Sequence, residues 1–368
     1  VVINKKDVEA FCKAADEENL ETAVVAVVTD NRRLVMNWRQ NTIVNLSRDF
    51  LDTNGVKQHI SVVVETPAKE TCYLDHIPGK VAALAPDLEK AWLENLKDLN
   101  VCSQKGLAER FDSSIGGNSV LMPFGGKNQL TPTEGMVAKL PVIGAETTTA
   151  TAMTYGYNPY LMEWSPFHGA MYAVIESVAK MVALGGRADK IRLTFQEYFE
   201  SLGTDSRKWG RPFAALLGAL WAQHQLEIPA IGGKDSMSGT FMDLTVPPTL
   251  TSFAVDVMKA DNALSPEFKV AGSKVYYVPM PKDKLAMPDF RKLRDTYEKV
   301  SNFIAAKKVF AASSVRMGGT AAAITKMCLG NGIGFRFNSK PSMEDLFKAD
   351  YGALILEVAP DSDIKEAL

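Results

Sequence analysis

A short segment in the middle of the chain combines mobile backbone, a cation, an anion and a hydroxyl group. Within IPAIGGKDSMSGTF (228–241), an apolar run typical of a buried strand ends at Gly232, Gly233, Lys234, Asp235 and Ser236. Glycines let backbone N–H groups approach a phosphate, and lysine adds a point charge. Asp235 can bind Mg²⁺ or pair with Lys234. A Walker A loop is excluded, because aspartate follows the lysine. An anion site and a tight turn closed by a salt bridge both remain open.

A second glycine pair lies between a predicted strand and a predicted helix, in the segment Arg316 to Thr320, RMGGT. A helix N-terminus has free N–H groups and about half a positive charge, so an anion can bind there. Two glycines ahead of an alanine-rich helix are more often explained by close packing of the helix on the strand. Both interpretations remain open on the residues alone.

Other polar and aromatic residues have simpler explanations than catalysis. Glu176 and Lys180 are four residues apart in a predicted helix, which is typical of a surface ion pair worth about 0.2–0.5 kcal/mol. His168 precedes this helix and is expected to be structural. A neighbouring aromatic tract is expected in the core or at an interface, and comprises Tyr155, Tyr157, Tyr160 and Trp164.

Strands and helices that alternate must position these residues, which places the chain in the α/β or α+β class. Strands are predicted over 22–29, 33–44, 118–123, 135–141, 191–195, 249–258, 274–280, 333–337 and 352–358. Helices are predicted over 6–19, 87–99, 169–183, 209–226 and 288–306, and a strand, turn and helix share 309–330. The tract 146–166 is expected to be extended and loop-like.

The composition excludes several classes of protein. Of 368 residues, 46% are hydrophobic and 23% charged, and the formal net charge is −2. This balance offers no field for nucleic acid, and no apolar run is long enough to span a membrane. Four cysteines without a CxxC pair and four histidines without zinc spacing indicate free thiols in a reducing cytoplasm. The ends, VVINKKDVEAF and APDSDIKEAL, are expected to be cut from a longer polypeptide.

The segment GGKDSMSG (232–239) resembles the signature of the large phosphoribosylformylglycinamidine synthases. Three further segments follow the order of that family: LPVIGAETTTATAM (140–153), AVIESVAKMVALGG (173–186) and IRLTF (191–195). The resemblance covers nearly the whole chain, and KDSMS after paired glycines is its most specific part. It implies an internal fragment of the synthase core, with a ferredoxin-like domain paired with an α/β domain of the aminoimidazole ribotide synthetase type.

The resemblance implies four parts in this chain. They are the end of a first synthetase-type α/β domain (1–66), a linker (67–109), a second ferredoxin-like domain (110–262) and a truncated second α/β domain (263–368). The first ATP-binding half and a glutaminase are expected elsewhere as partners, and a dimer of the fragment is compatible with this organisation. The implied activity is the ATP-dependent amidation of formylglycinamide ribotide in purine biosynthesis, using Mg²⁺ and glutamine-derived ammonia. Such an enzyme is a cytoplasmic carbon–nitrogen ligase, and the fragment alone is expected to be inactive.

The same resemblance assigns roles to the glycine-rich segment. Gly233 and Lys234 are expected near the nucleotide and metal, and Ser236 near the ribotide phosphate. These residues are expected to face the first half across a pseudo-twofold interface. The chemistry implied is phosphorylation of the amide oxygen, followed by displacement of phosphate by ammonia.

The second half of this family often holds an auxiliary, non-hydrolysed nucleotide with Mg²⁺, bound through Asp, Glu, Asn and Asp. The corresponding positions here are Gly144, Glu176, Lys180 and Ser314, so Glu176 is the one carboxylate left as a metal ligand. A cation that needs about six oxygen ligands is poorly served by such a set. We therefore expect this auxiliary site to be metal-free, and empty or holding an anion near Arg316.

Two other functions remain open. The chain can be a non-catalytic structural half with a degenerate nucleotide site, as the residues at the auxiliary site indicate. It can also be a related ATP-dependent phosphotransferase, such as a selenophosphate or thiamine-phosphate kinase relative. Those enzymes use aspartate-rich metal clusters, which this sequence lacks.

Overall fold

The computed structural model describes residues 1–52, 59–111, 113–360, 362 and 364. The chain forms two compact units, Val1–Ile60 and Ser61–Leu368. Within the described parts of the chain, no helix is both long and apolar enough to cross a lipid bilayer.

The smaller unit combines helices with one hairpin. Its elements are a 3₁₀ turn (Lys5–Asp7), α1 (Val8–Glu17), β1 (Arg33–Trp38), β2 (Asn41–Ser47) and α2 (Arg48–Asp52), with β1 and β2 antiparallel. The helix predicted over 6–19 is confirmed by α1. The Asn4 side chain caps the turn before it by accepting from the Lys6 nitrogen at 3.2 Å. The buried strand predicted over 22–29 is wrong. Among the described residues this segment pairs with no strand, and its valines are exposed because no apolar layer of the unit covers them.

Short helices of the predicted linker pack onto the larger unit. They are α3 (Gly79–Ala82), α4 (Leu88–Lys97) and α5 (Lys105–Ala108), with 3₁₀ turns at Lys69–Thr71 and Tyr73–Asp75. Asp87 caps α4 by accepting from the Lys90 nitrogen at 3.1 Å. Asn95 of α4 is buried and donates to the Gly318 carbonyl at 2.9 Å, so this segment helps to fix the turn before α10 (Gly319–Leu329).

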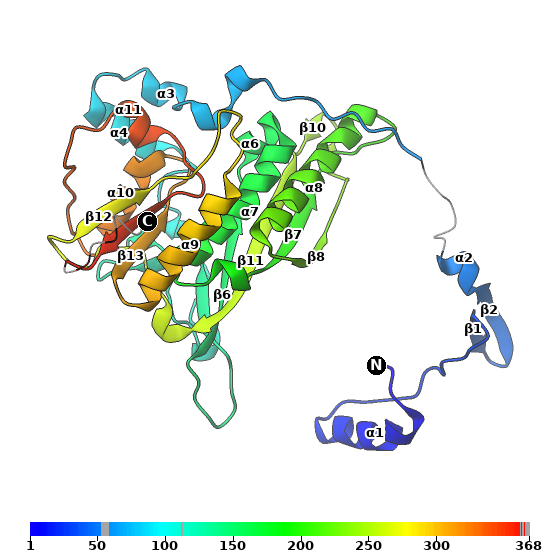
Figure 1. Ribbon diagram of the computed structural model, residues 1–368. Helices are drawn as coiled ribbons and strands as arrows, with labels where there is room; N and C mark the ends of the chain where they lie inside the picture. The colour runs from blue at the N-terminus through cyan, green and yellow to red at the C-terminus, as the bar shows by residue number, and fades with distance from the viewer. Residues whose placement is uncertain (53–58, 112, 361, 363, 365–368) are drawn as a thin grey trace. The chain divides into compact units, whose positions relative to one another are not determined.

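A five-stranded sheet forms the centre of the larger unit (Figure 1). In spatial order its strands are β5 (Met136–Lys139), β6 (Thr149–Gly156), β11 (Thr249–Lys259), β7 (Arg192–Tyr198) and β8 (Ala230–Lys234). Neighbours are antiparallel except β7 and β8, which are parallel and joined through α8 (Ser206–Leu226). Helix α7 (Pro166–Ala183) lies on one face of the sheet, and α8 packs beside it (Figure 1). Alternate residues of β6 and β11 are buried beneath α7, as expected of a sheet covered on one face.

A smaller sheet continues the same hydrophobic core. Its strands, in the order β12 (Lys274–Val278), β14 (Leu354–Val358) and β13 (Val309–Ser314), are antiparallel to their neighbours. Three helices accompany this sheet: α9 (Phe290–Ala305), α10 and α11 (Met343–Phe347). Helix α7 contacts β13, so the two sheets share one core rather than two. The remaining elements are β3 (Phe124–Gly125), β4 (Thr131–Pro132), α6 (Pro159–Trp164), β9 (Thr240–Phe241), β10 (Leu244–Thr245) and 3₁₀ turns at 115–117, 188–190 and 260–262.

The large sheet leaves apolar side chains uncovered. Exposed large apolar residues on its strands are Met136, Met153, Tyr155, Tyr198, Ile231 and Val257. An exposed apolar surface of this kind usually marks a site where another protein segment docks.

The mixed α/β class is confirmed, and most central and C-terminal elements lie where they were predicted. Three further predictions of secondary structure are wrong. The tract 146–166 contains β6 and α6, because its alternating threonines and alanines suit a half-buried central strand. Segment 118–123 makes only an isolated bridge, and 333–337 is irregular. The ferredoxin-like pairing is not confirmed, since the elements follow the order β6–α7–β7–α8–β8–β11. The predicted boundaries at 66, 109 and 262 remain predictions.

Candidate functional site

A cavity of about 310 Å³ lies among β6, α7, β13 and the start of α10. We name it the charged cavity, because two carboxylates and two cations, Glu134, Glu176, Arg316 and Lys326, line it. The lining residues considered below are Glu134, Tyr155, Tyr157, Glu176, Ser313, Ser314, Arg316, Met317, Gly319, Ala322, Ala323, Lys326, Met327 and Tyr351.

Helix α7 supplies a buried ion pair to this cavity. The helix starts where Ser165 accepts from the His168 nitrogen at 3.3 Å, and the four-residue spacing then places Glu176 and Lys180 on one face. Their Oε1 and Nζ atoms are 2.7 Å apart, and only 6% and 2% of the two side chains is exposed. The predicted i,i+4 ion pair is therefore confirmed, but it is buried and not on the surface, because α7 is covered on nearly every side. Burial lowers the pKa of Lys180, and the Glu176 charge opposes that shift.

The start of strand β5 at Met136 leaves room for the Lys180 ammonium. The β5–β6 ladder stops at the pair Met136–Met153, two residues before Tyr155. Lys180 donates to the Tyr155 carbonyl at 2.7 Å and lies 4.2 Å from the centre of its ring. The second oxygen of Glu176 accepts from the Tyr157 nitrogen at 3.0 Å. Both charges are thus held by backbone groups of β6 and of the residue that follows it.

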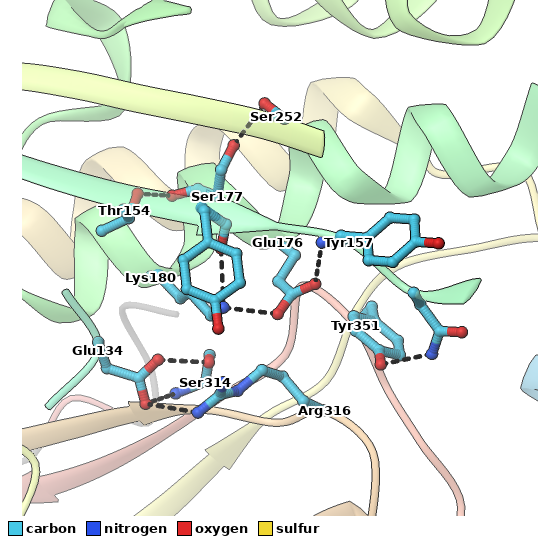
Figure 2. Close-up of polar contacts among 12 residues, drawn as sticks. Glu134, Thr154, Tyr157, Glu176, Ser177, Lys180, Ser252, Ser314, Arg316 and Tyr351 are labelled. Carbon is cyan, nitrogen blue, oxygen red and sulfur yellow. Dashed lines mark hydrogen bonds and ion pairs between the residues drawn. The ribbon is translucent and has the colours of Figure 1, made fainter. Parts of the chain in front are cut away.

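A second carboxylate, Glu134, comes from the loop before β5. It accepts from the Ser313 hydroxyl at 2.9 Å, the Ser314 nitrogen at 3.1 Å and the Ser314 hydroxyl at 2.6 Å. The Arg316 guanidinium lies 3.8 Å from the same carboxylate. Figure 2 shows this group facing the Glu176–Lys180 pair.

Helix α10 contributes the third cation. Gly319, Ala322, Ala323 and Lys326 occupy one face of the helix, and the two alanines have only small side chains there. Among the described residues, the Lys326 ammonium has no hydrogen-bond or ion-pair partner. Burial first, and then the Arg316 charge, lower the pKa of Lys326 to about 8.

The donor set does not suit Mg²⁺. Magnesium requires about six oxygen ligands in near-octahedral geometry. The described residues contain no group of three or more His, Cys, Asp or Glu side chains that could hold a metal ion. Glu176 already accepts from Lys180 and a backbone N–H, and Glu134 accepts three hydrogen bonds. A divalent cation would have to displace an ammonium that lies 2.7 Å from the Glu176 oxygen.

The structure brings together four of the five residues predicted for the auxiliary site: Glu176, Lys180, Ser314 and Arg316. Gly144 is not with them. It lies in the exposed loop between β5 and β6 at a φ of +66°, with no atom within 4 Å of the position a Cβ would occupy. Sequence reasoning missed Glu134 and Lys326. One signal for Glu134 was present in the sequence. It is the single glutamate of the glycine-rich segment 124–135, and Arg316 needs a carboxylate as its partner.

The predicted glycine-rich site lies on β8, at the edge of the large sheet. Gly232, Gly233 and Lys234 are the last residues of this strand, and they are exposed together with Asp235. The expected burial of the strand is wrong, since an edge strand has a neighbour on one side only. The salt-bridged turn is wrong as well, because no ion pair joins Lys234 to Asp235 in the described structure.

Hydrogen bonds to β7 and beyond hold this edge in place. The hydroxyl of Thr194 donates to the Gly232 carbonyl at 3.1 Å, and the Phe199 nitrogen donates to the Ser236 carbonyl at 2.9 Å. The hydroxyls of Ser236 and Ser238 are 2.8 Å apart. The Lys234 ammonium and this hydroxyl pair thus belong to a fixed but accessible segment.

Proteins similar to this chain along most of its length are subunits of one biosynthetic enzyme. No protein-family model matches the chain. The phosphoribosylformylglycinamidine synthase subunit PurL of Thermoplasma acidophilum is 22% identical over 394 residues, covering 97% of this chain and 48% of the relative. The subunit of Picrophilus torridus is 24% identical over 381 residues, covering 95% and 48%. The chain therefore spans about half the length of the curated relatives it matches.

Solved structures of the same subunit share the fold. The "Structure of PurLQS from Thermotoga maritima" has a TM-score of 0.64 at 16% identity, covering 99% of this chain and 52% of the other. The structure titled "T. maritima PurL complexed with FGAR" has a TM-score of 0.63 at 16% identity, covering 99% and 51%. The resemblance to this family that GGKDSMSG predicts is thus confirmed.

Proposed function

We propose that this chain is part of an enzyme that amidates formylglycinamide ribotide to formylglycinamidine ribotide, with ATP and glutamine-derived ammonia as co-substrates. The observation that carries the proposal is the exposed GGKDS edge of β8, in a chain that aligns with PurL subunits over nearly its whole length. Thermotoga maritima PurL has been solved with ATP and with FGAR, which supports the same substrates here.

Lys234 and the serine pair are the groups that would act on the substrates. Phosphorylation of an amide oxygen builds negative charge on the transferred group and its neighbours, and a fixed ammonium stabilises that charge. Lys234 pairs in register with Gln196 of β7, whose side-chain amide donates to the Lys234 carbonyl at 3.4 Å. The Ser236 and Ser238 hydroxyls can donate to a ribotide phosphate without a change in the backbone. Ammonia then displaces the phosphate from the activated amide carbon.

The uncovered sheet face supports a partner half. Its apolar side chains include Met153 on β6, Val257 on β11 and Tyr198 on β7, the strand next to the edge strand β8 that holds Lys234. A first synthetase half on this face would complete the site, with an α/β domain of the aminoimidazole ribotide synthetase type beside it. ATP and Mg²⁺ for catalysis would be bound with that half, and a glutaminase partner would supply ammonia. The whole enzyme would be a carbon–nitrogen ligase, and this chain alone would be inactive.

The test uses the complete polypeptide encoded around this chain. Lys234→Met should lower kcat/KM for ATP- and glutamine-dependent amidation by about 10²-fold or more, because it removes one preorganised charge. Lys139→Met, at an exposed position at the end of β5, is the matched control and should change little. Unchanged kinetics of Lys234→Met would favour the alternative of a structural half. Turnover by this chain alone would contradict its dependence on a partner.

A structural role is favoured at one place only, the charged cavity. There the Lys180 ammonium stands 2.7 Å from the Glu176 carboxylate, where a metal-bound nucleotide would need that oxygen. The two roles concern different faces and are compatible: chemistry at the edge of β8, and stabilisation at the cavity.

A further inference from the structure

We infer that the charged cavity binds a phosphate group without a divalent cation, and that Lys326 and Arg316 are its ligands. The inference rests on the cavity alone and does not depend on the proposed amidation. The chemistry is that of a phosphate monoester or free phosphate, held by side-chain cations instead of by a metal.

The two carboxylates of the cavity already have hydrogen-bond donors or a lysine as partners. Glu134 accepts three hydrogen bonds from Ser313 and Ser314, at 2.6 to 3.1 Å. Glu176 is held by Lys180 at 2.7 Å and by the Tyr157 nitrogen at 3.0 Å. Lys180 therefore acts as a built-in counter-ion, in the place where an external cation would otherwise be required. Neither carboxylate has an open oxygen pair to offer a metal.

One cation of the cavity has no carboxylate partner. Lys180 neutralises Glu176, and Arg316 lies 3.8 Å from Glu134. The Lys326 ammonium also lines the cavity and has no hydrogen-bond or ion-pair partner among the described residues. A lysine in partly desolvated surroundings gains most from an anion, because water no longer solvates its charge. The lowered pKa of Lys326, about 8, is consistent with a buried ammonium that lacks an anion beside it.

The volume and the wall of the cavity fit a phosphate that carries an organic group. A volume of about 310 Å³ is at the lower end of the range for small-molecule sites, and exceeds what a lone phosphate fills. Ala322 and Ala323 of α10 line the cavity beside Lys326 with small side chains. Tyr157, Met317 and Met327 provide apolar and aromatic wall for an organic group attached to the phosphate.

The experiment is calorimetric titration of the 368-residue chain with inorganic phosphate and, separately, with AMP. Each titration is run once in EDTA and once in excess Mg²⁺. We expect at least one ligand to bind, with dissociation constants in the two buffers that agree within about twofold, since no metal takes part. Equal affinity for the two ligands would identify free phosphate as the source, and tighter binding of AMP would identify a nucleotide.

Variants separate the cavity from the rest of the surface. Lys326→Met should weaken binding by about tenfold or more, the loss typical of one charge-assisted hydrogen bond in a desolvated site. Lys299→Met, on the exposed side of α9, should bind as the parent chain does. Circular dichroism confirms that each variant is folded. Absence of binding by both ligands, binding that requires Mg²⁺, or unchanged affinity in folded Lys326→Met would each overturn the inference; the Mg²⁺ comparison needs no variant.

Discussion

The buried pair Glu176–Lys180 gives the sharpest prediction, because an exposed copy of the same spacing exists in the chain. The two side chains are 6% and 2% exposed and are 2.7 Å apart. In α9, Asp295 and Lys299 are also four residues apart, at 2.8 Å, but are 62% and 38% exposed. Acid precedes lysine in both pairs, so the comparison isolates burial.

The magnitude follows from what each change leaves behind. Lys180→Met leaves a buried carboxylate with one backbone donor and should lower the free energy of unfolding by about 3–5 kcal/mol. Glu176→Gln leaves a buried ammonium and should cost about 2–4 kcal/mol. The double variant removes both charges, and its main loss is the donor to the Tyr155 carbonyl, about 1–3 kcal/mol. Lys299→Met should cost at most about 0.5 kcal/mol.

Urea denaturation followed by tryptophan fluorescence measures these energies. Trp38 is the only one of the five tryptophans in the smaller unit, so a Trp38→Phe background reports on the larger unit alone. The double variant should then be more stable than the summed single losses predict, by about 2 kcal/mol or more. If the single losses simply add, or if Lys180→Met costs less than about 1 kcal/mol, the two charges do not compensate each other as described.

Three further predictions use the same fluorescence assay. Burial, helped by a neighbouring aspartate, raises the pKa of Glu197 to about 7 from 4.5. The folded chain thus holds this proton between about pH 4.5 and 7 while the unfolded chain loses it, so stability falls as pH rises through that window. Glu197→Gln should therefore stabilise by about 2–3 kcal/mol at pH 8 and by almost nothing near pH 4; equal effects at both pH values would refute this. Gly319 has a φ of +65°, and a Cβ there would lie 2.3 Å from the Leu346 carbonyl oxygen, so Gly319→Ala should cost about 2 kcal/mol or more, whereas Gly106→Ala, with nothing within 4 Å, should not destabilise. Asn158→Ala removes the side chain that caps α6 at 2.8 and 3.0 Å and should cost about 2–3 kcal/mol; a loss below about 0.5 kcal/mol would mean that the cap is dispensable.

Local patterns predicted the helices well because the helical period is written in neighbouring residues. The stretch from Trp209 to Leu226 was predicted as a helix and lies within α8, and 169–183 lies within α7. Strands were less predictable where burial depends on distant partners. Segment 22–29 is as apolar as a core strand, yet it has no neighbour among the described residues. Segment 149–156 is rich in threonine, yet it is central in the large sheet because β11 and β5 flank it.

The candidate site was predictable in part for the same reason. Glu176 and Lys180 are near in sequence, so their pairing was foreseen, but their burial was not, because it depends on the whole surroundings of α7. Glu134 and Ser314 are 180 residues apart, and no local pattern joins them. The exposure of GGKDS follows from the edge position of β8, which is a property of strand order and not of composition.

The late start of β5 has a consequence for protein engineering. The ladder stops at Met136–Met153, and the backbone oxygen just beyond it is the one that Lys180 uses. If this edge strand were longer by one residue pair of the ladder, the Tyr155 carbonyl would accept a hydrogen bond from the sheet. Lys180 would then lose its acceptor. The length of one peripheral strand thereby decides whether the helix beneath it can tolerate a charge, so an insertion before Met136 that keeps Glu134 would alter the ionic character of the pocket.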